Sequence, residues 1–204
     1  QDRISSEGAL EITVVGHQWW WEFRYPSLGI TTANELHVPE KTKVKFTFTS
    51  ADVLHSFWIP RWGGKIDVIP GEGAENHLVL TTPKLNATNA NANIFQGQCA
   101  ELCGLSHALM RFDVVVNSSN DFEAWSQDFN SVPNVESELE KQGEMLFARC
   151  AACHTISGTP SHELEKDLLA LDPPMYKAGP NLTKFGSRRS IGSGIRKNNF
   201  ENFK

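Results

Sequence analysis

The most constraining feature of the chain is a stretch in which four metal-ligand side chains recur within twelve residues. It spans residues 98–110 and carries Cys99, Cys103, His107 and Met110. Thiolate, imidazole and thioether groups together suit copper, because soft sulfur ligands select copper or zinc and zinc has little use for a methionine. A mononuclear copper loop needs one cysteine. A second cysteine four positions along therefore favours a dinuclear copper site bridged by two thiolates.

A structural zinc site and a disulfide are the alternative interpretations of this loop. A disulfide between these cysteines would close only a small loop and gain little stability. A two-copper site also needs an imidazole for each ion, and the loop holds one. His55 is the best candidate for the other, because it lies in an apolar segment that ends at Pro60. His37 and His77 rank lower, each as a lone histidine on an expected strand.

The other two cysteines, Cys150 and Cys153, directly precede His154. This C-x-x-C-H spacing is the attachment signature of a c-type haem, in which both thiols add to the vinyl groups and the histidine becomes the proximal iron ligand. A Gly-Pro-Asn-Leu segment at 179–182 follows at a distance that suits the haem-edge loop of a small cytochrome. A zinc site or a thioredoxin-like motif is the alternative. The four cysteines thus predict two separate redox sites.

Length and composition allow one domain of ordinary size and a smaller one. Of the 204 residues, 40% are hydrophobic and 21% charged, which indicates a globular chain. No run approaches the roughly 18 apolar residues of a membrane span. There is no initiator methionine, so we expect a trimmed or partial chain with any anchor upstream. Basic residues gather at 184–204 within an overall charge of −5. They could neutralise haem propionates, although a solvated surface explains them equally well.

Short strands separated by turn signals dominate the first part of the chain. Residues 9–15 and 43–50 alternate between apolar and polar side chains, as half-buried strands do. We therefore predict a mainly β Greek-key sandwich, with the metal loop between its last two strands. Phe122, Trp125 and Phe129 have helical spacing, and Ser137 and Glu140 form a capping box for a second helix. The predicted organisation is a sandwich domain at 1–130, a linker at 131–137 and a small all-α domain at 138–204.

Three consecutive tryptophans follow His17, which we expect to be structural. Trp19, Trp20 and Trp21 cannot share one face of a strand, because successive side chains alternate. At least one is therefore expected to be exposed, and an exposed aromatic near a redox centre suggests a docking surface. The alternative is that all three pack in the core or against a neighbouring subunit.

Several of these stretches resemble subunit II of haem-copper cytochrome c oxidases, namely residues 17–25, 53–60, 65–71 and 99–110. Residues 138–204 resemble the cytochrome c domain that is fused to this subunit in some bacterial oxidases. The resemblance implies a cupredoxin-like sandwich that holds the dinuclear copper centre CuA. The implied ligands are Cys99, Cys103, His55, His107, Met110 and the backbone carbonyl of Glu101.

The resemblance also implies further site residues. Cys150, Cys153 and His154 would hold a covalent haem c. The Glu101 carboxylate would reach a Mg²⁺ ion shared with subunit I, and Trp19 would be the aromatic through which electrons enter. In the family an axial methionine follows the 179–182 segment. The chain ends before any such residue, and Met145 and Met175 do not match it, so we expect a truncated C-terminus.

The implied function is electron transfer within a terminal oxidase. Electrons would pass from cytochrome c or another respiratory complex through the haem to CuA. From CuA they would reach subunit I, where oxygen is reduced to water with proton pumping. The other oxidase subunits are expected partners, and nucleic acid is not. The implied location is the periplasmic or outer face of a bacterial cell membrane, with anchor helices upstream. A stand-alone electron carrier, a nitrous oxide reductase-like CuA protein and a copper-delivery protein are the alternatives.

Overall fold

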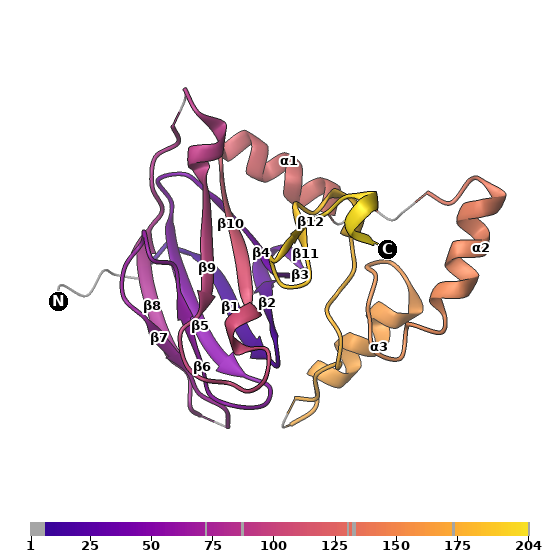
Figure 1. The fold of residues 1–204 in the computed structure, drawn as a ribbon, viewed down its shortest axis with the longest axis horizontal. Helices are drawn as coiled ribbons and strands as arrows, with labels where there is room; N and C mark the ends of the chain where they lie inside the picture. The colour runs from indigo at the N-terminus through magenta and orange to yellow at the C-terminus, as the bar shows by residue number, and fades with distance from the viewer. Residues whose placement is uncertain are drawn as a thin grey trace.

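Two five-stranded sheets packed face to face form the larger part of the molecule (Figure 1). The computed structural model describes residues 7–203 except 72, 87, 130, 132, 133 and 173. The first sheet has the order β3 (Ile30–Ala33), β2 (Trp20–Tyr25), β1 (Leu10–His17), β5 (Lys43–Ser50), β8 (Asn76–Thr81). The second has the order β4 (Glu35–Pro39), β10 (Arg111–Asn117), β9 (Ile94–Cys99), β6 (His55–Trp58), β7 (Ile66–Val68). The predicted mainly β sandwich is confirmed.

Aromatic side chains from both sheets fill the core. In β5 every second residue is buried, which places Phe46 and Phe48 inside, as the alternation predicted. The Phe57 ring of β6 lies 5.1 Å from Phe48 across the sandwich and 4.8 Å from Phe112 of its own sheet. A Cβ at position 97 would lie 2.0 Å from the Phe112 ring, so only glycine fits there. Burying each such ring stabilises the fold by about 1.5–3 kcal/mol.

The tryptophan triplet is more deeply buried than the alternation suggested. Trp21 enters the core and is fully buried, and Trp20 is 6% exposed on the opposite face. Trp20 stacks on His17 with ring centroids 3.9 Å apart. The C-terminal part covers this face, because Tyr176 makes an edge contact with His17 at 5.6 Å. Only Trp19 is half-buried, and none of the three is fully exposed.

In the part of the chain that the structure describes, three helices follow the sandwich. α1 (Ser119–Phe129) lies against the sandwich, where Trp125 contacts the Tyr25 ring at 5.5 Å and Phe129 is buried. α2 (Glu138–Phe147) begins with the predicted capping box of Ser137 and Glu140, and α3 (Pro160–Leu169) follows. Both predicted helices are confirmed. Positions 132 and 133 of the predicted linker lie outside the described residues, so the domain division stays a prediction.

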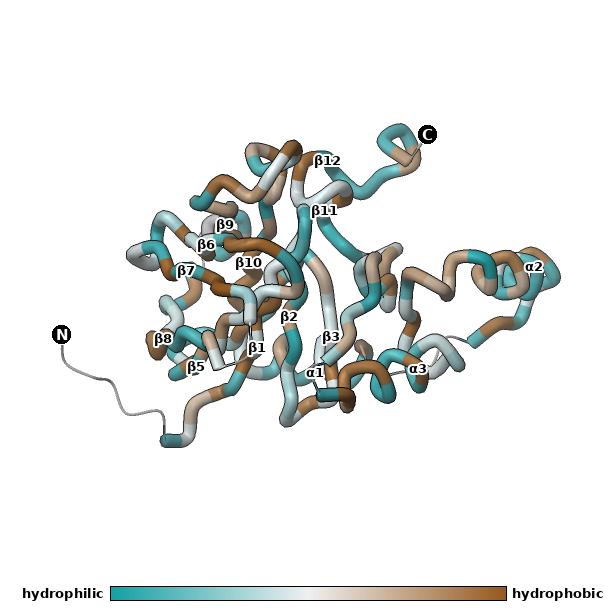
Figure 2. Tube along the Cα trace, turned by 90° about the horizontal axis from the view of Figure 1, so that it is seen from below, coloured by the Kyte–Doolittle hydropathy of each residue, from teal (hydrophilic) through white to brown (hydrophobic). Residues whose placement is uncertain are grey.

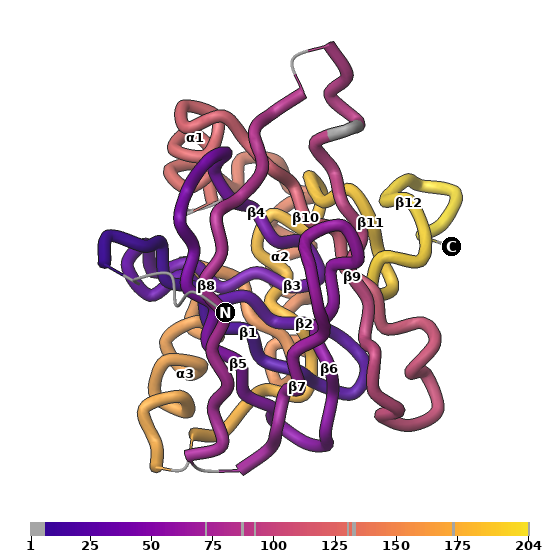
Figure 3. The backbone as a smooth tube through the Cα atoms, turned by 90° about the vertical axis from the view of Figure 1, so that its left-hand side faces the viewer, coloured from indigo at the N-terminus to yellow at the C-terminus, as the bar shows by residue number. Residues whose placement is uncertain are grey.

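The last part of the chain lies beside the β2–β3 side of the first sheet and the β4–β10 side of the second, and α2 extends away from the sandwich (Figures 1 and 2). The predicted domain at 138–204 also contains a short two-stranded sheet, β11 (Ser190–Ile191) with β12 (Arg196–Lys197), so its all-α character stays a prediction. The described residues also form five 3₁₀ turns: η1 (Pro26–Leu28), η2 (Ala90–Asn93), η3 (His107–Leu109), η4 (Phe185–Ser187) and η5 (Phe200–Phe203). The β8–β9 connection projects beyond the sheets (Figure 3). Within the described residues, no helix has the length and apolar character needed to cross a bilayer.

Candidate metal centres

The predicted copper loop joins β9 to β10 and is closed at its base by the strand ladder. The Cys99 N–H donates to the Met110 carbonyl at 2.9 Å, so both ends of the loop are fixed by one backbone hydrogen bond. Gly104 has a φ of +117°, which strains any residue with a side chain. A Cβ there would also lie 3.0 Å from the Trp19 ring. Glycine thus lets the loop fold back against the sandwich.

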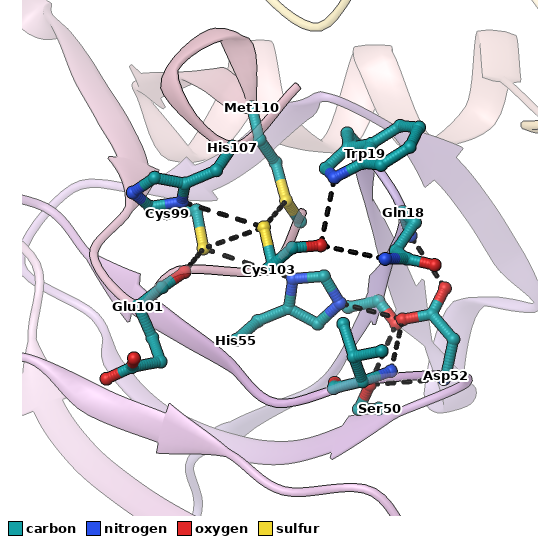
Figure 4. A network of polar contacts seen from close by, with 12 residues as sticks. Gln18, Trp19, Ser50, Asp52, His55, Cys99, Glu101, Cys103, His107 and Met110 are labelled. Carbon is teal, nitrogen blue, oxygen red and sulfur yellow. Dashed lines mark hydrogen bonds and ion pairs between the residues drawn. The ribbon is translucent and has the colours of Figure 1, made fainter. Parts of the chain in front are cut away.

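Three sulfur atoms converge inside this loop (Figure 4). The Sγ atoms of Cys99 and Cys103 are 3.7 Å apart, and the Met110 Sδ lies 3.7 Å from the Cys103 Sγ. The Glu101 carbonyl oxygen lies 3.2 Å from the Cys99 Sγ. Both thiols are free, and all three sulfur side chains are buried. The loop therefore directs its soft donors to one point in the buried interior.

Two imidazoles face these sulfurs from different parts of the chain. His55, the first residue of β6, is fully buried, with Nδ1 3.9 Å from the Cys99 Sγ. His107 comes from the loop itself, with Nδ1 3.6 Å from the Cys103 Sγ. The ligand atoms of His55, Cys99 and Cys103 all lie within 4.8 Å of one another. The structure thus brings together every donor that the sequence predicted for copper.

The electrostatics of the two thiols favour a bound cation. Burial raises the pKa of Cys99, but hydrogen bonding with His55 and with the backbone at Ser56 outweighs it and lowers the pKa to about 6. Burial and the adjacent Cys99 charge raise the pKa of Cys103 to about 12. Both thiols ionise together only if a positive charge compensates them, because two like charges at this distance repel strongly. The donor set therefore fits a soft metal cation.

Asp52 orients His55, and sequence reasoning did not assign it a role. Its Oδ1 lies 2.8 Å from the His55 Nε2, and its Oδ2 accepts the Gln18 N–H at 2.6 Å. A carboxylate only accepts, so Nε2 carries the proton and Nδ1 keeps a lone pair toward Cys99. Burial would lower the His55 pKa, but the hydrogen bonds with Cys99 and Asp52 raise it. The signal in the sequence was an acid three residues before a candidate ligand.

Trp19 is bonded directly to the copper loop. Its Nε1–H donates to the Cys103 carbonyl at 3.0 Å, and the Gln18 side-chain amide donates to the same oxygen at 2.8 Å. The Trp19 carbonyl in turn accepts the Ser193 hydroxyl at 2.7 Å. The indole is therefore one hydrogen bond away from a predicted copper ligand.

His17, expected to be structural, and the lower-ranked candidates His37 and His77 have partners elsewhere. His17 stacks on a tryptophan ring, His37 lies 2.9 Å from Glu35, and His77 lies 3.2 Å from the Thr47 hydroxyl. The structure does not bring any of these three to the sulfur cluster.

The C-x-x-C-H motif follows α2 on the surface. Cys150 and Cys153 are free and exposed. The His154 Nδ1 lies 2.8 Å from the Pro180 carbonyl oxygen, which only accepts, so Nε2 is left unprotonated and available to a metal. A Cβ at Gly179 would lie 2.5 Å from the His154 Cε1, so glycine makes room for the ring. The thiols and the imidazole thus suit covalent attachment and axial ligation.

Apolar side chains around this motif are uncovered to an unusual degree. In α2 no described residue is buried, although the helix carries several large apolar side chains. The exposed ones in this part of the chain include Leu139 at 78%, Met145 at 68%, Leu146 at 59% and Met175 at 56%. Such a surface fits a bulky apolar prosthetic group that supplies part of the core.

The comparisons with known proteins agree with this geometry. Residues 28–119 match the family model described as the periplasmic domain of cytochrome c oxidase subunit II. A crystal structure of the periplasmic domain of subunit II of cytochrome oxidase from Bradyrhizobium japonicum is 30% identical, with a TM-score of 0.53. The match covers 60% of this chain and 94% of that one. The chain belongs to the cytochrome c oxidase subunit II family. The cupredoxin-like interpretation of the sandwich is thereby confirmed.

Two subunit II relatives match almost the whole chain, including the region with the C-x-x-C-H motif. Cytochrome c oxidase subunit 2 of Bacillus subtilis (strain 168) is 39% identical over 202 residues, which is 98% of this chain and 53% of that protein. The same subunit of Bacillus sp. (strain PS3) is 38% identical over 206 residues, or 100% of this chain and 54% of that protein. The chain thus spans about half the length of these subunit II relatives.

Proposed function

We propose that this chain is the electron-transfer part of subunit II in a terminal cytochrome c oxidase. The observation that carries the proposal is the convergence of two thiols, two imidazoles, a thioether and a carbonyl at one largely buried place. We assign them to the dinuclear copper centre CuA. Cys99 and Cys103 would bridge the ions, and His55, His107, Met110 and the Glu101 carbonyl would complete the set.

A covalent haem c is the second cofactor of the proposal. Cys150 and Cys153 would form its thioether bonds, and His154 would be the proximal ligand through Nε2. The Pro180 carbonyl supports this role because it fixes the tautomer of the ring. The exposed apolar side chains of α2 support it too, since a haem would cover them.

Bound in these two sites, copper and haem would supply one-electron redox chemistry. Electrons would pass from cytochrome c or another respiratory donor to subunit I, where oxygen is reduced to water with proton pumping. The contribution of the chain is to fix the ligands, exclude water and orient the imidazoles of His55 and His154, each through a hydrogen bond. Trp19 is bonded to the Cys103 carbonyl, which supports its role as the aromatic through which electrons reach the copper loop. We place the domain on the outer face of a bacterial cell membrane, anchored by helices upstream.

The Glu101 side chain is assigned to a different metal from its carbonyl. Figure 4 shows the carboxylate directed away from the sulfur cluster, and its Oε1 accepts the Leu102 N–H at 3.1 Å. Carboxylate oxygens suit Mg²⁺, which binds proteins through few carboxylates and retains water. We propose that Glu101 contributes one ligand to a Mg²⁺ ion at the boundary with subunit I.

The copper assignment is tested by substituting one bridging cysteine. Cys99→Ser should abolish the electron paramagnetic resonance signal of a mixed-valence copper pair, because serine does not provide a bridging thiolate. Haem absorption should persist. Cys150→Ser is the matched control, since it should impair haem attachment and leave the copper signal intact. An unchanged copper signal in Cys99→Ser would sink the assignment.

A further inference from the structure

The segment at 188–194, called here the docking segment, ties the C-terminal part to the sandwich. Its Arg189 N–H donates to the Glu35 carboxylate at 2.9 Å, and its Ser190 hydroxyl donates to the Asp113 carboxylate at 2.8 Å. Both acceptors are buried and sit opposite each other on β4 and β10. Hydrogen bonds to charged acceptors are stronger than those between neutral groups, so this contact should hold the docking segment on the sandwich.

The far end of the docking segment reaches Trp19. The Ser193 hydroxyl donates to the Trp19 carbonyl at 2.7 Å, and the Ser193 carbonyl accepts the Arg111 N–H at 3.1 Å. Gly194 has a φ of +79°, and a Cβ there would lie 3.3 Å from the Arg111 Cβ. The segment therefore lies tightly against the strand that ends the copper loop.

Arg188 joins the docking segment to the loop that holds the haem ligand. Its guanidinium donates to the Thr183 carbonyl at 3.2 Å and to the Asn181 carbonyl, next to the Pro180 that orients His154. Desolvation lowers the pKa of Arg188 to about 10, while the charge of Glu35 opposes that effect. Burial raises the pKa of Glu35, but its hydrogen bonds with His37 and Arg189 and the positive charge of Arg188 lower it overall. Arg188 and Glu35 are thus oppositely charged neighbours.

A small cavity marks where the two parts face each other. It has a volume of about 190 Å³, and its lining includes Trp19 and Trp20 from the sandwich and Pro180, Leu182 and Ile191 from the C-terminal part. Around this cavity, the docking segment connects the two sides: Arg188 bonds the segment that orients His154, and Ser193 bonds Trp19.

We propose that the docking segment holds His154 and the 179–182 segment in a fixed position against the part of the sandwich that carries Trp19. The fused haem region then does not swing on its linker. The effect on electron transfer rests on the proposed function, whereas the docking itself rests on the hydrogen bonds alone. Arg188, Ser190 and Ser193 are positioning residues in it. A fixed separation matters because electron tunnelling weakens steeply with distance.

The structural content is tested by hydrogen–deuterium exchange on the full chain. The amides of Arg111 and Arg189 should be protected, because each donates within the docked arrangement. Ser190→Ala/Ser193→Ala should raise exchange at both amides roughly tenfold or more, since it removes one charged and one neutral hydrogen bond. Ser187→Ala is the matched control, because that exposed hydroxyl bonds only within its own turn to Lys184. Unprotected amides in the unmodified chain would overturn the docking.

The electron-transfer consequence is tested on the chain loaded with copper and haem. After flash reduction of the haem, one electron moves from ferrous iron to the oxidised copper pair. In the unmodified chain the rate of this electron transfer should not depend on solvent viscosity. In Ser190→Ala/Ser193→Ala the rate should fall in proportion to the fraction of molecules that stay docked, and it should become viscosity-dependent. A rate that falls with viscosity in the unmodified chain would overturn the proposal. A chain that binds no haem would instead contradict the proposed function, and exchange would still decide the docking.

Discussion

Cys99 and Cys103 lie in the closed core of the sandwich, whereas Cys150 and Cys153 lie on the surface next to a helix with no buried residue. The copper donors are positioned by strands whose packing does not involve the metal. The haem donors are correctly spaced, but the apolar side chains around them have little to pack against. The comparison teaches that a small ion can occupy a site that the fold has already built, while the haem we propose would itself supply part of the core.

The largest expected effect is on the sandwich side of this comparison. Phe57→Ala removes a ring that is 3% exposed and packs against Trp21, Phe48 and Phe112. It should lower the free energy of unfolding of the sandwich by about 3–5 kcal/mol, because the core does not collapse around so large a cavity. Denaturant titration followed by tryptophan fluorescence measures the loss.

Leu105→Ala is the control for this substitution, because Leu105 is 98% exposed. It should change the free energy of unfolding by less than about 0.5 kcal/mol. Equal losses in the two variants would mean that the aromatic core does not hold the copper region together.

A smaller effect is expected on the haem side. Gly179→Ala places a Cβ 2.5 Å from the His154 ring, which must shift away from the Pro180 carbonyl. Such overpacking costs about 1–3 kcal/mol. The haem absorption spectrum should report a disturbed axial histidine, while the thioether bonds and the copper spectrum should persist.

Gly143→Ala provides the matched glycine control. Position 143 lies inside α2 with nothing within 4 Å of an added Cβ. Alanine there should stabilise the helix by about 0.5–1 kcal/mol and leave the haem spectrum unchanged. A haem spectrum altered equally by both substitutions would contradict the specific role given to Gly179.

Local patterns in the sequence predicted the sandwich and its elements well. The alternation in β5, the capping box at Ser137 and the position of the copper loop between β9 and β10 are all properties of neighbouring residues. The ligand types in the loop likewise needed only the order of residues. His55 was inferred from the missing imidazole, and the structure places it beside Cys99.

What the sequence did not predict depends on contacts between distant segments. Trp20 is buried because Tyr176 and its neighbours cover a face of β2 that a lone strand would leave open. Asp52 orients His55 only because the Gln18 amide and the turn before β6 meet it. The docking segment has no motif, since its serines bond to acceptors far away in the chain. These features required the folded arrangement of the two parts.

The central claim is that the copper region is folded without its metal, whereas the haem region depends on its prosthetic group. It is tested most directly by hydrogen–deuterium exchange on the full chain after copper chelation and, separately, in Cys150→Ser/Cys153→Ser. We expect chelation to leave β5, β6 and β10 protected. Loss of haem attachment should raise exchange in α2 alone, because an isolated helix of ten residues is marginal in water. Loss of protection in the strands on chelation, or full protection of α2 without haem, would contradict the account.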